Sequence, residues 1–324
     1  MIGYTFKTYL ADGREYFNYG VSEIGGTALT EKDFPFPGSL LRLLRLDIWQ
    51  YEPLMKDIEK AILRFYQTRE QKDADIILAG LNELAEAHIY FQLLRLDWRY
   101  RLEQAQRSTV VSLVDLLPRK ELTHIPSTID TMQKQLLHIF QNVLDADSGE
   151  KTDPIPERMA VYYRRHGADT LNTFQFQALP LKFEAVNEKT FTEVLYPNSI
   201  YDLIDYSLRE CVQREQRVRL CKNCGQYFAL TGRGTAEYCD LTADDKGRTC
   251  KETGAIHQWT KSKADDEAFK LYRREYKRRF AWIKAGKISS EELYVWGEIA
   301  REKKAECDEG KITIQEYQSW LRKS

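Results

Sequence analysis

The chain has 324 residues, of which 43% are hydrophobic and 12% aromatic, so it has enough apolar material for folded cores and is not generally disordered. The 48 Lys and Arg nearly balance the 49 Asp and Glu, so the net charge of −1 indicates no particular partner. The length is typical of two domains with room for a small appendage. No apolar run approaches the roughly 20 residues of a membrane span, and no secretion signal is recognisable. We therefore expect a cytoplasmic protein without membrane contact.

The N-terminal part of the sequence predicts a β-hairpin followed by a helical region. Residues 5–11 and 14–19 are rich in Thr, Tyr and Phe. The Asp12-Gly13 pair between them suits a type I′ turn, whose two central residues need positive φ. Residues 39–172 mostly show apolar side chains at helical spacing. We therefore expect a hairpin at the start of a mainly helical domain.

Three further local signals indicate elements along the chain. Asp73 is expected to cap a long helix. Residues 173–185 alternate apolar and polar side chains over short runs, which predicts a strand interrupted by Pro180. Ser199 is expected to cap a helix that runs towards Arg219 and leads into a cysteine-rich segment.

Four of the six cysteines are clustered in a way that predicts a metal site. Cys221 and Cys224 form a CxxCG knuckle, in which two thiolates can bind one metal from a tight turn and Gly225 can adopt positive φ. Cys239 and Cys250 follow after gaps of 14 and 10 residues and complete a tetrahedral set. Four cysteines are preferred by structural Zn²⁺ and leave no open position for a catalytic water. The expected cofactor is therefore Zn²⁺ in a structural site.

At the level of sequence, other roles for these residues stay open. His257, seven residues beyond Cys250, is an alternative fourth ligand. A CxxC pair can also be redox-active, although two further cysteines close by favour a metal. Cys211 and Cys307 fall within predicted helices and are interpreted as small core residues. The glycine-rich stretch 231–235 is either a flexible tip of the zinc loop or an anion-binding nest.

Residues 264–285 predict one helix with two different faces. Five apolar residues fall within an arc of about 80° and form the expected packed face: Phe269, Tyr272, Tyr276, Phe280 and Ile283. A different arc of about 140° is cationic and contains Lys270, Arg273, Arg274, Lys277, Arg278 and Lys284. Arg279 lies outside the cationic arc, beside the aromatic face. The helix is thus expected to present a continuous positive surface.

The positive charge of the chain is concentrated around this helix. Residues 209–287 contain 19 Lys and Arg against 11 Asp and Glu, a net charge of +8. Residues 1–208 contain 23 against 30, a net charge of −7, and residues 288–324 contain 6 against 8, a net charge of −2. A basic stripe beside a zinc knuckle is the footprint expected for binding phosphate backbones. The candidate nucleic-acid contacts are Arg219, Lys222, Arg233, Arg248, Lys251, Lys270, Arg273, Arg274, Lys277 and Arg278.

The C-terminal segment contains two copies of a helix-to-helix turn, 24 residues apart. Gly286 and Gly310 are each expected to end a helix in the left-handed conformation. Ser289 and Thr313 are expected to cap the next helix, each with a glutamate three residues later that closes a capping box. The tryptophan that follows each turn is expected to pack and not to bind a ligand.

From Val194 onward the sequence resembles an uncharacterised bacterial family known only as a domain of unknown function. The matching motifs are CKNCGQYF at 221–228, Tyr238-Cys239-Asp240, Gly247 through Cys250, Gly254-Ala255, the Tyr272–Phe280 basic stretch and GKIS. More distantly, the knuckle preceded by a helix is similar to CGNR zinc-finger proteins, presumed bacterial transcription regulators. That similarity implies the same four cysteines as ligands. The present sequence departs from it after Cys250, where Lys-Glu-Thr replaces Gly-Asn-Arg.

The expected fold is mainly α and has three parts. Residues 1–190 form a mostly helical domain that starts with the hairpin and ends with the short β segment, residues 191–262 contain a helix and the four-cysteine zinc-binding unit, and residues 263–324 contain the basic helix and two capped C-terminal helices. The expected function is zinc binding with nucleic-acid binding, to DNA or RNA, or regulation. The alternative is a zinc-stabilised interaction module whose basic helix contacts an acidic protein surface. We expect no enzymatic activity, because no catalytic motif is recognisable and the five histidines are scattered.

Overall fold

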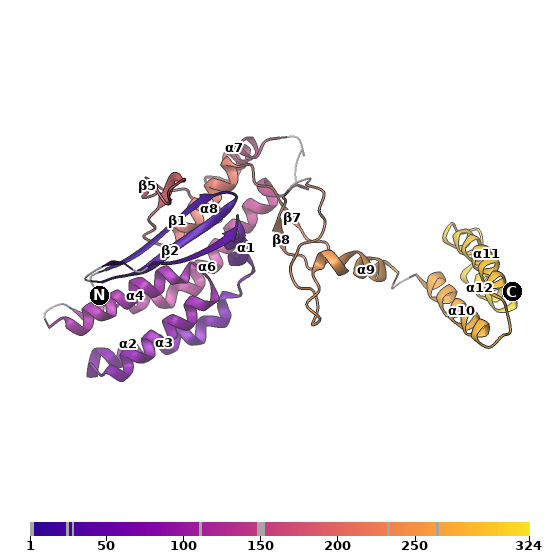
Figure 1. Cartoon of the computed structure of the whole chain (residues 1–324), viewed down its shortest axis with the longest axis horizontal. Helices are drawn as coiled ribbons and strands as arrows, with labels where there is room; N and C mark the ends of the chain where they lie inside the picture. The colour runs from indigo at the N-terminus through magenta and orange to yellow at the C-terminus, as the bar shows by residue number, and fades with distance from the viewer. Residues whose placement is uncertain are drawn as a thin grey trace. The chain divides into compact units, whose positions relative to one another are not determined.

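The computed structural model describes residues 3–23, 26–27, 29–109, 112–147, 153–231, 234–263 and 266–324. The protein is mainly α-helical, as the sequence predicts, and the predicted N-terminal hairpin is part of an antiparallel sheet (Figure 1). The chain folds into two units. Unit 1 comprises Met1–Leu220 and Gln226–Ala236, and unit 2 comprises Cys221–Gly225 and Glu237–Ser324. Among the described residues, no helix is both long enough and apolar enough to traverse a bilayer.

The hairpin of β1 (Gly3–Ala11) and β2 (Arg14–Glu23) is the centre of the sheet in unit 1. Asp12 and Gly13 join the two strands with φ of 51° and 71°. Both values are positive, as a type I′ turn requires, so the predicted turn is confirmed. Side chains on one face of the hairpin, including Phe6 and Phe17, are buried in the core of unit 1.

Strands from other parts of the chain complete this sheet. β4 (Thr30–Pro35) and the short β3 (Gly26–Thr27) pair with β2, β6 (Phe191–Leu195) pairs with β1, and β5 (Leu181–Ala185) pairs with β6. The strand predicted over 173–185 is therefore shorter than expected. It begins only after Pro180, which has no N–H to donate to a ladder.

The helices of unit 1 pack against one another and, in part, against this sheet. They are α1 (Gly38–Arg45), η1 (Ile48–Tyr51), α2 (Glu52–Thr68), α3 (Gln71–Ala87), α4 (Phe91–Arg107), α5 (Leu113–Leu116), α6 (Arg119–Ile139), η2 (Phe140–Leu144), α7 (Ile155–His166) and α8 (Ile200–Gln213). α4 packs against β1 and β2 (Figure 1), and residues of α8 belong to the same core. β7 (Val218–Leu220) and β8 (Tyr227–Ala229) form a separate two-stranded sheet.

One predicted helix cap in unit 1 is confirmed and another is wrong. The Ser199 hydroxyl accepts a hydrogen bond from the Asp202 backbone N–H and caps α8. Asp73 does not cap α3, because the helix begins two residues earlier, at Gln71. Its buried carboxylate instead accepts a hydrogen bond of 2.7 Å from Arg64 Nε. An ion pair between neighbouring helices has replaced the expected backbone cap.

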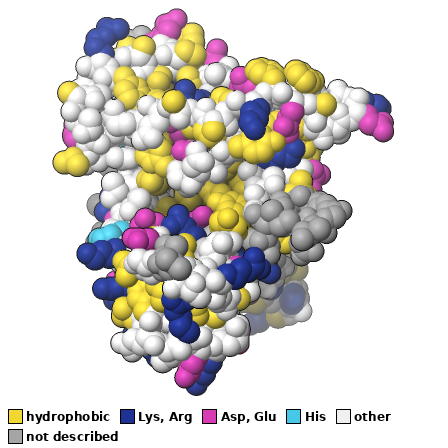
Figure 2. Space-filling view, turned by 90° about the vertical axis from the view of Figure 1, so that its left-hand side faces the viewer, with side chains coloured by type: hydrophobic (Ala, Val, Ile, Leu, Met, Phe, Trp, Pro, Cys, Tyr) yellow, Lys and Arg dark blue, Asp and Glu magenta, His cyan; other side chains and the backbone are white. Residues whose placement is uncertain are grey.

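The face of the molecule in Figure 2 has no large area of one charge sign. Hydrophobic side chains gather in a central hollow, and Lys, Arg, Asp and Glu side chains are interspersed around it. The face therefore does not have the one-signed character of a phosphate-binding surface.

The helices of unit 2 are α9 (Cys250–Ser262), α10 (Glu267–Lys284), α11 (Ser290–Asp308) and α12 (Ile314–Lys323). The last three share a core that includes Ala268, Trp296 and Tyr317. Both predicted turns are confirmed. Their glycines have φ of 68° and 73°, and the two capping boxes of Ser289 with Glu292 and Thr313 with Glu316 are formed.

The predicted packed face of α10 is partly wrong. Phe280 is 48% exposed, whereas Glu275 and Arg279 are buried towards the neighbouring helices. The Arg279 guanidinium lies 4.5 Å from the centre of the Trp296 ring and 3.4 Å from Glu275, and it donates a hydrogen bond to the carbonyl of Ser324. The buried side of α10 therefore combines Tyr272 and Ile283 of the predicted face with an ion pair beside it, and Phe280 and Tyr276 are left partly on the surface.

Candidate metal centre

The four predicted cysteines converge in unit 2. Cys221 and Cys224 lie in the knuckle between β7 and β8, Cys239 lies in the following loop, and Cys250 is the first residue of α9. Their Sγ atoms all lie within 4.8 Å of one another. Three of the four side chains are buried, and Cys224 is exposed. This grouping is what a single four-coordinate ion requires.

Local backbone geometry positions both pairs of cysteines. Gly225 has φ of 70°, as predicted, and its N–H donates to the carbonyl of Cys221 at 2.9 Å, which closes the knuckle. The Cys250 N–H donates to Leu241, and the Lys251 N–H donates to the carbonyl of Cys239 at 3.0 Å. A capping box of Thr249 and Glu252 starts α9 at Cys250. This T-x-x-E signal is visible in the sequence, and our sequence analysis missed it.

Hydrogen-bond donors surround the sulfur atoms. The Cys239 backbone N–H donates to Cys221 Sγ at 3.4 Å, and Asn223 Nδ2 donates to Cys250 Sγ at 3.2 Å. Burial opposes ionisation of Cys221, but backbone N–H groups of its neighbours outweigh it and lower the pKa of this thiol to about 7. Such donors stabilise negative charge on sulfur, as metal-thiolate bonding requires.

The pKa of the Cys239 thiol is shifted in the opposite direction, upwards. Burial raises the pKa of the Cys239 thiol, and the neighbouring cysteine side chains raise it further. Four thiolates in so small a volume repel one another unless a cation lies among them. The chemistry of the donor set therefore fits a divalent ion, and soft sulfur ligands in a tetrahedral arrangement favour Zn²⁺.

The structure favours cysteine over His257 as the fourth ligand. Among the described residues, the group of close ligand atoms contains the four cysteines and not this histidine. His257 Nδ1 instead lies 3.2 Å from Asn223 Oδ1, and the same asparagine donates to Cys250. His257 therefore contacts a residue that supports the ligands. No local sequence signal identifies Asn223 as a supporting residue, because its role depends on contacts with residues distant in the chain.

A close approach holds α9 against the cysteine loop. A Cβ atom at Gly254 would lie 2.3 Å from Cδ1 of the Tyr238 ring, so only glycine fits there without a shift of the ring or the helix. On the next turn, Gln258 donates a hydrogen bond to the backbone carbonyl of Lys222. Residues of α9 thus contact both the loop that carries Cys239 and the knuckle that carries Cys221 and Cys224.

Five of the ten predicted basic contacts are paired with described residues of the chain. Arg219 has a side chain that is only 15% exposed, and it binds Asp147 and the backbone carbonyls of Gly234 and Ala236. The other paired cations and their acids are Lys222 with Glu237, Arg248 with Asp244, Lys251 with Asp240 and Arg278 with Glu275. Arg233 lies outside the described residues. The knuckle itself therefore presents less uncompensated charge than the sequence suggested.

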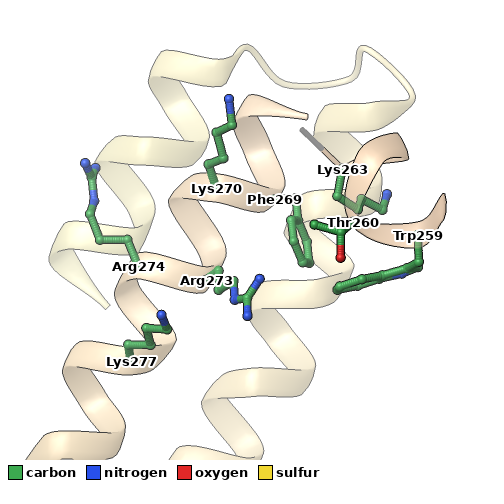
Figure 3. A pocket seen from close by; sticks show the side chains of 8 residues that line it. All are labelled: Trp259, Thr260, Lys263, Phe269, Lys270, Arg273, Arg274 and Lys277. Atoms are coloured by element: carbon green, nitrogen blue, oxygen red, sulfur yellow. The ribbon is translucent and has the colours of Figure 1, made fainter. Parts of the chain in front are cut away.

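Four predicted contacts on α10 differ from these. Lys270, Arg273, Arg274 and Lys277 form no ion pair with any described residue and line a pocket of about 450 Å³ between α9 and α10. Trp259 and Phe269 share this pocket, and their rings meet edge to face with centroids 5.3 Å apart (Figure 3). The predicted contacts that form no ion pair with a described residue therefore all lie on α10, in a pocket that also contains aromatic rings.

The site and fold thus define a mainly helical protein with a candidate four-cysteine metal centre at the start of α9 and a basic aromatic pocket at its other end. Residues 171–323 match a protein family of unknown function, DUF6076. This match confirms that the C-terminal part resembles an uncharacterised family, and it includes all four cysteines and the helices α9 to α12. Neither a curated protein nor a solved structure matches the chain.

Proposed function

We propose that this is a zinc-binding, nucleic-acid-binding protein. In the proposal, Zn²⁺ on the four cysteines has a structural role, and the cations of α10 contact phosphates of DNA or RNA. The observation that carries it is the convergence of four Sγ atoms within 4.8 Å, close in sequence to a helix whose cations line a pocket and form no ion pair with a described residue. The proposed role is binding without catalysis, because a closed set of four sulfur ligands leaves no position for a reacting molecule.

A structural ion at this place would organise the basic surface. The ligand Cys250 is the first residue of α9, and α9 carries Trp259 and Thr260 to the pocket on α10. Structural zinc supplies folding free energy directly, so metal binding and the order of α9 would be coupled. The reducing conditions of the cytoplasm, where we propose the protein acts, keep such thiols available for metal.

The similarity to CGNR zinc-finger proteins supports a regulatory role. Those proteins are presumed bacterial transcription regulators that also place a helical region before a four-cysteine finger. Here the arginine of the Gly-Asn-Arg motif is absent after Cys250, and Arg248 and Lys251, which flank this cysteine, are both ion-paired. In the proposal, the α10 cations Lys270, Arg273, Arg274 and Lys277 therefore contact the phosphates, and the cations at the knuckle do not.

The test is binding of the zinc-loaded full chain to random-sequence duplex DNA, single-stranded DNA and RNA across a salt series. A variant with Lys270, Arg273, Arg274 and Lys277 changed to Gln should weaken the salt dependence, by about 0.7–0.9 in log–log slope for each phosphate that the variant no longer binds. The matched control changes four exposed, ion-paired cations of unit 1 to Gln, namely Lys56, Lys60, Arg99 and Lys134. Equal effects of both variants, or no binding at low salt, would refute the nucleic-acid part of the proposal.

A second candidate is a zinc-stabilised interaction module that binds an acidic protein surface. It is favoured by a group of exposed apolar residues on α11, where Tyr294 is 65%, Val295 55% and Ile299 43% exposed. In this case the four-Gln variant would lose binding to an acidic polypeptide such as poly-glutamate. Addition of duplex or single-stranded nucleic acid would not compete for the site.

A further inference from the structure

The pocket between α9 and α10 has a composition suited to a specific form of nucleic acid. Trp259 is 49% exposed, and its ring meets Phe269 edge to face at the pocket wall. Figure 3 shows the Arg273 side chain reaching towards these rings, with Lys270, Arg274 and Lys277 along α10. The pocket thus combines an accessible flat ring with cations that have no ion-pair partner among the described residues.

Beyond the pocket, α10 again places an exposed aromatic ring beside a cation. Phe280 is 48% exposed, and Lys284 Nζ lies 5.8 Å from the centre of its ring. At 100° per residue, positions 269, 273, 277, 280 and 284 fall within an arc of about 80° of the helix. Phe269 and Phe280 are separated by about 16 Å along the axis. At about 3.4 Å per stacked nucleotide, this distance corresponds to a strand of about five nucleotides.

This surface exists because of how α10 packs. Arg279 and Glu275 occupy the side of the helix that faces α11 and α12, so the phenylalanines at 269 and 280 are turned away from the core. The arrangement is the combination of stacking platform and cationic track that proteins use for single strands.

We infer that the pocket of Trp259 and Phe269 binds single-stranded nucleic acid, with one unpaired base stacked on Trp259 and the neighbouring phosphates on Arg273 and Lys277. The inference rests on the proposed nucleic-acid function and names its ligand. The phosphates of a duplex can pair with the cations of α10, but its base faces stay stacked inside the double helix and cannot stack on Trp259. An acidic peptide also satisfies the cations and has no base to stack on the ring. A single strand uses both parts of the pocket.

The experiment measures the affinity of the zinc-loaded full chain for three labelled probes. They are a 15-nucleotide thymidine strand, an abasic strand of equal length, and a 15-base-pair duplex. The abasic strand keeps the phosphates and removes the bases. The variants are Trp259→Ala, Trp259→Phe and, as a matched control, Trp49→Ala, since Trp49 is similarly exposed at 46% but lies in η1 of unit 1. Zinc content and circular dichroism of each variant check that the fold is retained.

The thymidine strand should bind more tightly than the abasic strand and the duplex. Trp259→Ala should weaken binding of the thymidine strand by about fivefold or more and leave binding of the abasic strand unchanged. Trp259→Phe keeps an aromatic ring and should bind the thymidine strand more tightly than Trp259→Ala does. Trp49→Ala should have no effect. Equal binding of the thymidine and abasic strands, or an equal effect of Trp259→Ala on both, would refute base stacking while leaving nucleic-acid binding intact. Failure of all three probes to bind at low salt would instead refute the proposed function itself.

Discussion

Asn223 Nδ2 donates a hydrogen bond to Cys250 Sγ at 3.2 Å, although the two residues are 27 positions apart in the chain. This contact connects the knuckle to the first residue of α9, and Asn223 Oδ1 continues it to His257 at 3.2 Å. The asparagine inside the CxxC motif therefore supports the cysteine most distant from it in sequence. Such supporting hydrogen bonds orient metal ligands and tune their basicity.

Replacement of Asn223 by Ala should lower zinc affinity by about 10–100-fold without changing the stoichiometry of one ion per chain, because it removes an N–H donor to a thiolate but no ligand. Competition with a chromogenic chelator measures this. The control is Asn142→Ala, which removes a comparable side-chain bond, to the carbonyl of His138 in unit 1. Equal zinc affinity of both variants would show that the Asn223 contact does not support the metal.

The ligand assignment predicts a different outcome for the cysteines themselves. Cys221→Ser or Cys224→Ser should release the metal and unfold the α9 region, while the helices of unit 1 keep their circular dichroism signal and cooperative melting, because their core contains neither residue. Cys307→Ser is the control, since this cysteine packs on the helical core of α10 to α12. Metal analysis that finds one zinc per chain in both ligand variants would contradict the assignment.

Gly254→Ala should destabilise the metal-bound α9 region by about 1–3 kcal/mol, because the new Cβ would overlap the Tyr238 ring. Gly297→Ala on α11 is the matched control. A Cβ there meets only the Tyr272 hydroxyl at 4.0 Å, and alanine favours a helix by about 1 kcal/mol over glycine. Thermal melting of the zinc-loaded protein distinguishes them. The double variant Gly254→Ala/Tyr238→Ala should be less destabilised than the sum of its two single variants, and simple additivity would argue against this contact.

A buried polar network in unit 1 predicts an unusual dependence of stability on pH. The Ser39 hydroxyl donates to Glu15 Oε2 at 2.6 Å, and His88 Nε2 lies 3.0 Å from the Ser39 carbonyl. Burial raises the pKa of Glu15 to about 7 from an ordinary value of 4.5. Burial also lowers the pKa of His88 to about 4 from 6.5, with a smaller contribution from Arg42. Both groups therefore favour their neutral forms in the folded protein.

The two shifts affect stability in opposite directions. Between about pH 4.5 and 7 the folded state retains a proton on Glu15 that the unfolded state has lost, so this group lowers stability as pH rises. Between about pH 4 and 6.5 the unfolded state protonates His88 and the folded state does not, so this group raises stability as pH rises. In the overlap, from about pH 4.5 to 6.5, the two slopes should largely cancel.

Single substitutions should reveal each slope. Glu15→Gln should make the free energy of unfolding rise with pH below about 6.5, and His88→Gln should make it fall between about pH 4.5 and 7. Each slope is at most about 1.4 kcal/mol per pH unit. Urea unfolding of unit 1, followed at several pH values, measures them. Parallel pH profiles for the two variants would contradict the opposite shifts.

The sequence by itself determined the features that depend on neighbouring residues. The Asp12-Gly13 turn, the Ser199 cap of α8 and the two C-terminal capping boxes all arise within a few positions of the chain, where local conformational preference is decisive. The four cysteines were also identifiable, because a CxxC pair followed by two more cysteines is a spacing typical of metal ligands.

Only the tertiary structure decided the pairings between distant segments. Tyr9 of β1 pairs with Val194 of β6, and Arg219 is bound by Asp147, although nothing in the intervening sequence signals either contact. The orientation of α10 was decided in the same way. Its helical periodicity allowed the whole aromatic face to be buried, but Trp296 offers a ring to the Arg279 guanidinium, so the ion pair with Glu275 is buried and Phe280 is left exposed. A pattern along one helix shows which residues share a face, whereas the neighbouring helices decide which face is covered.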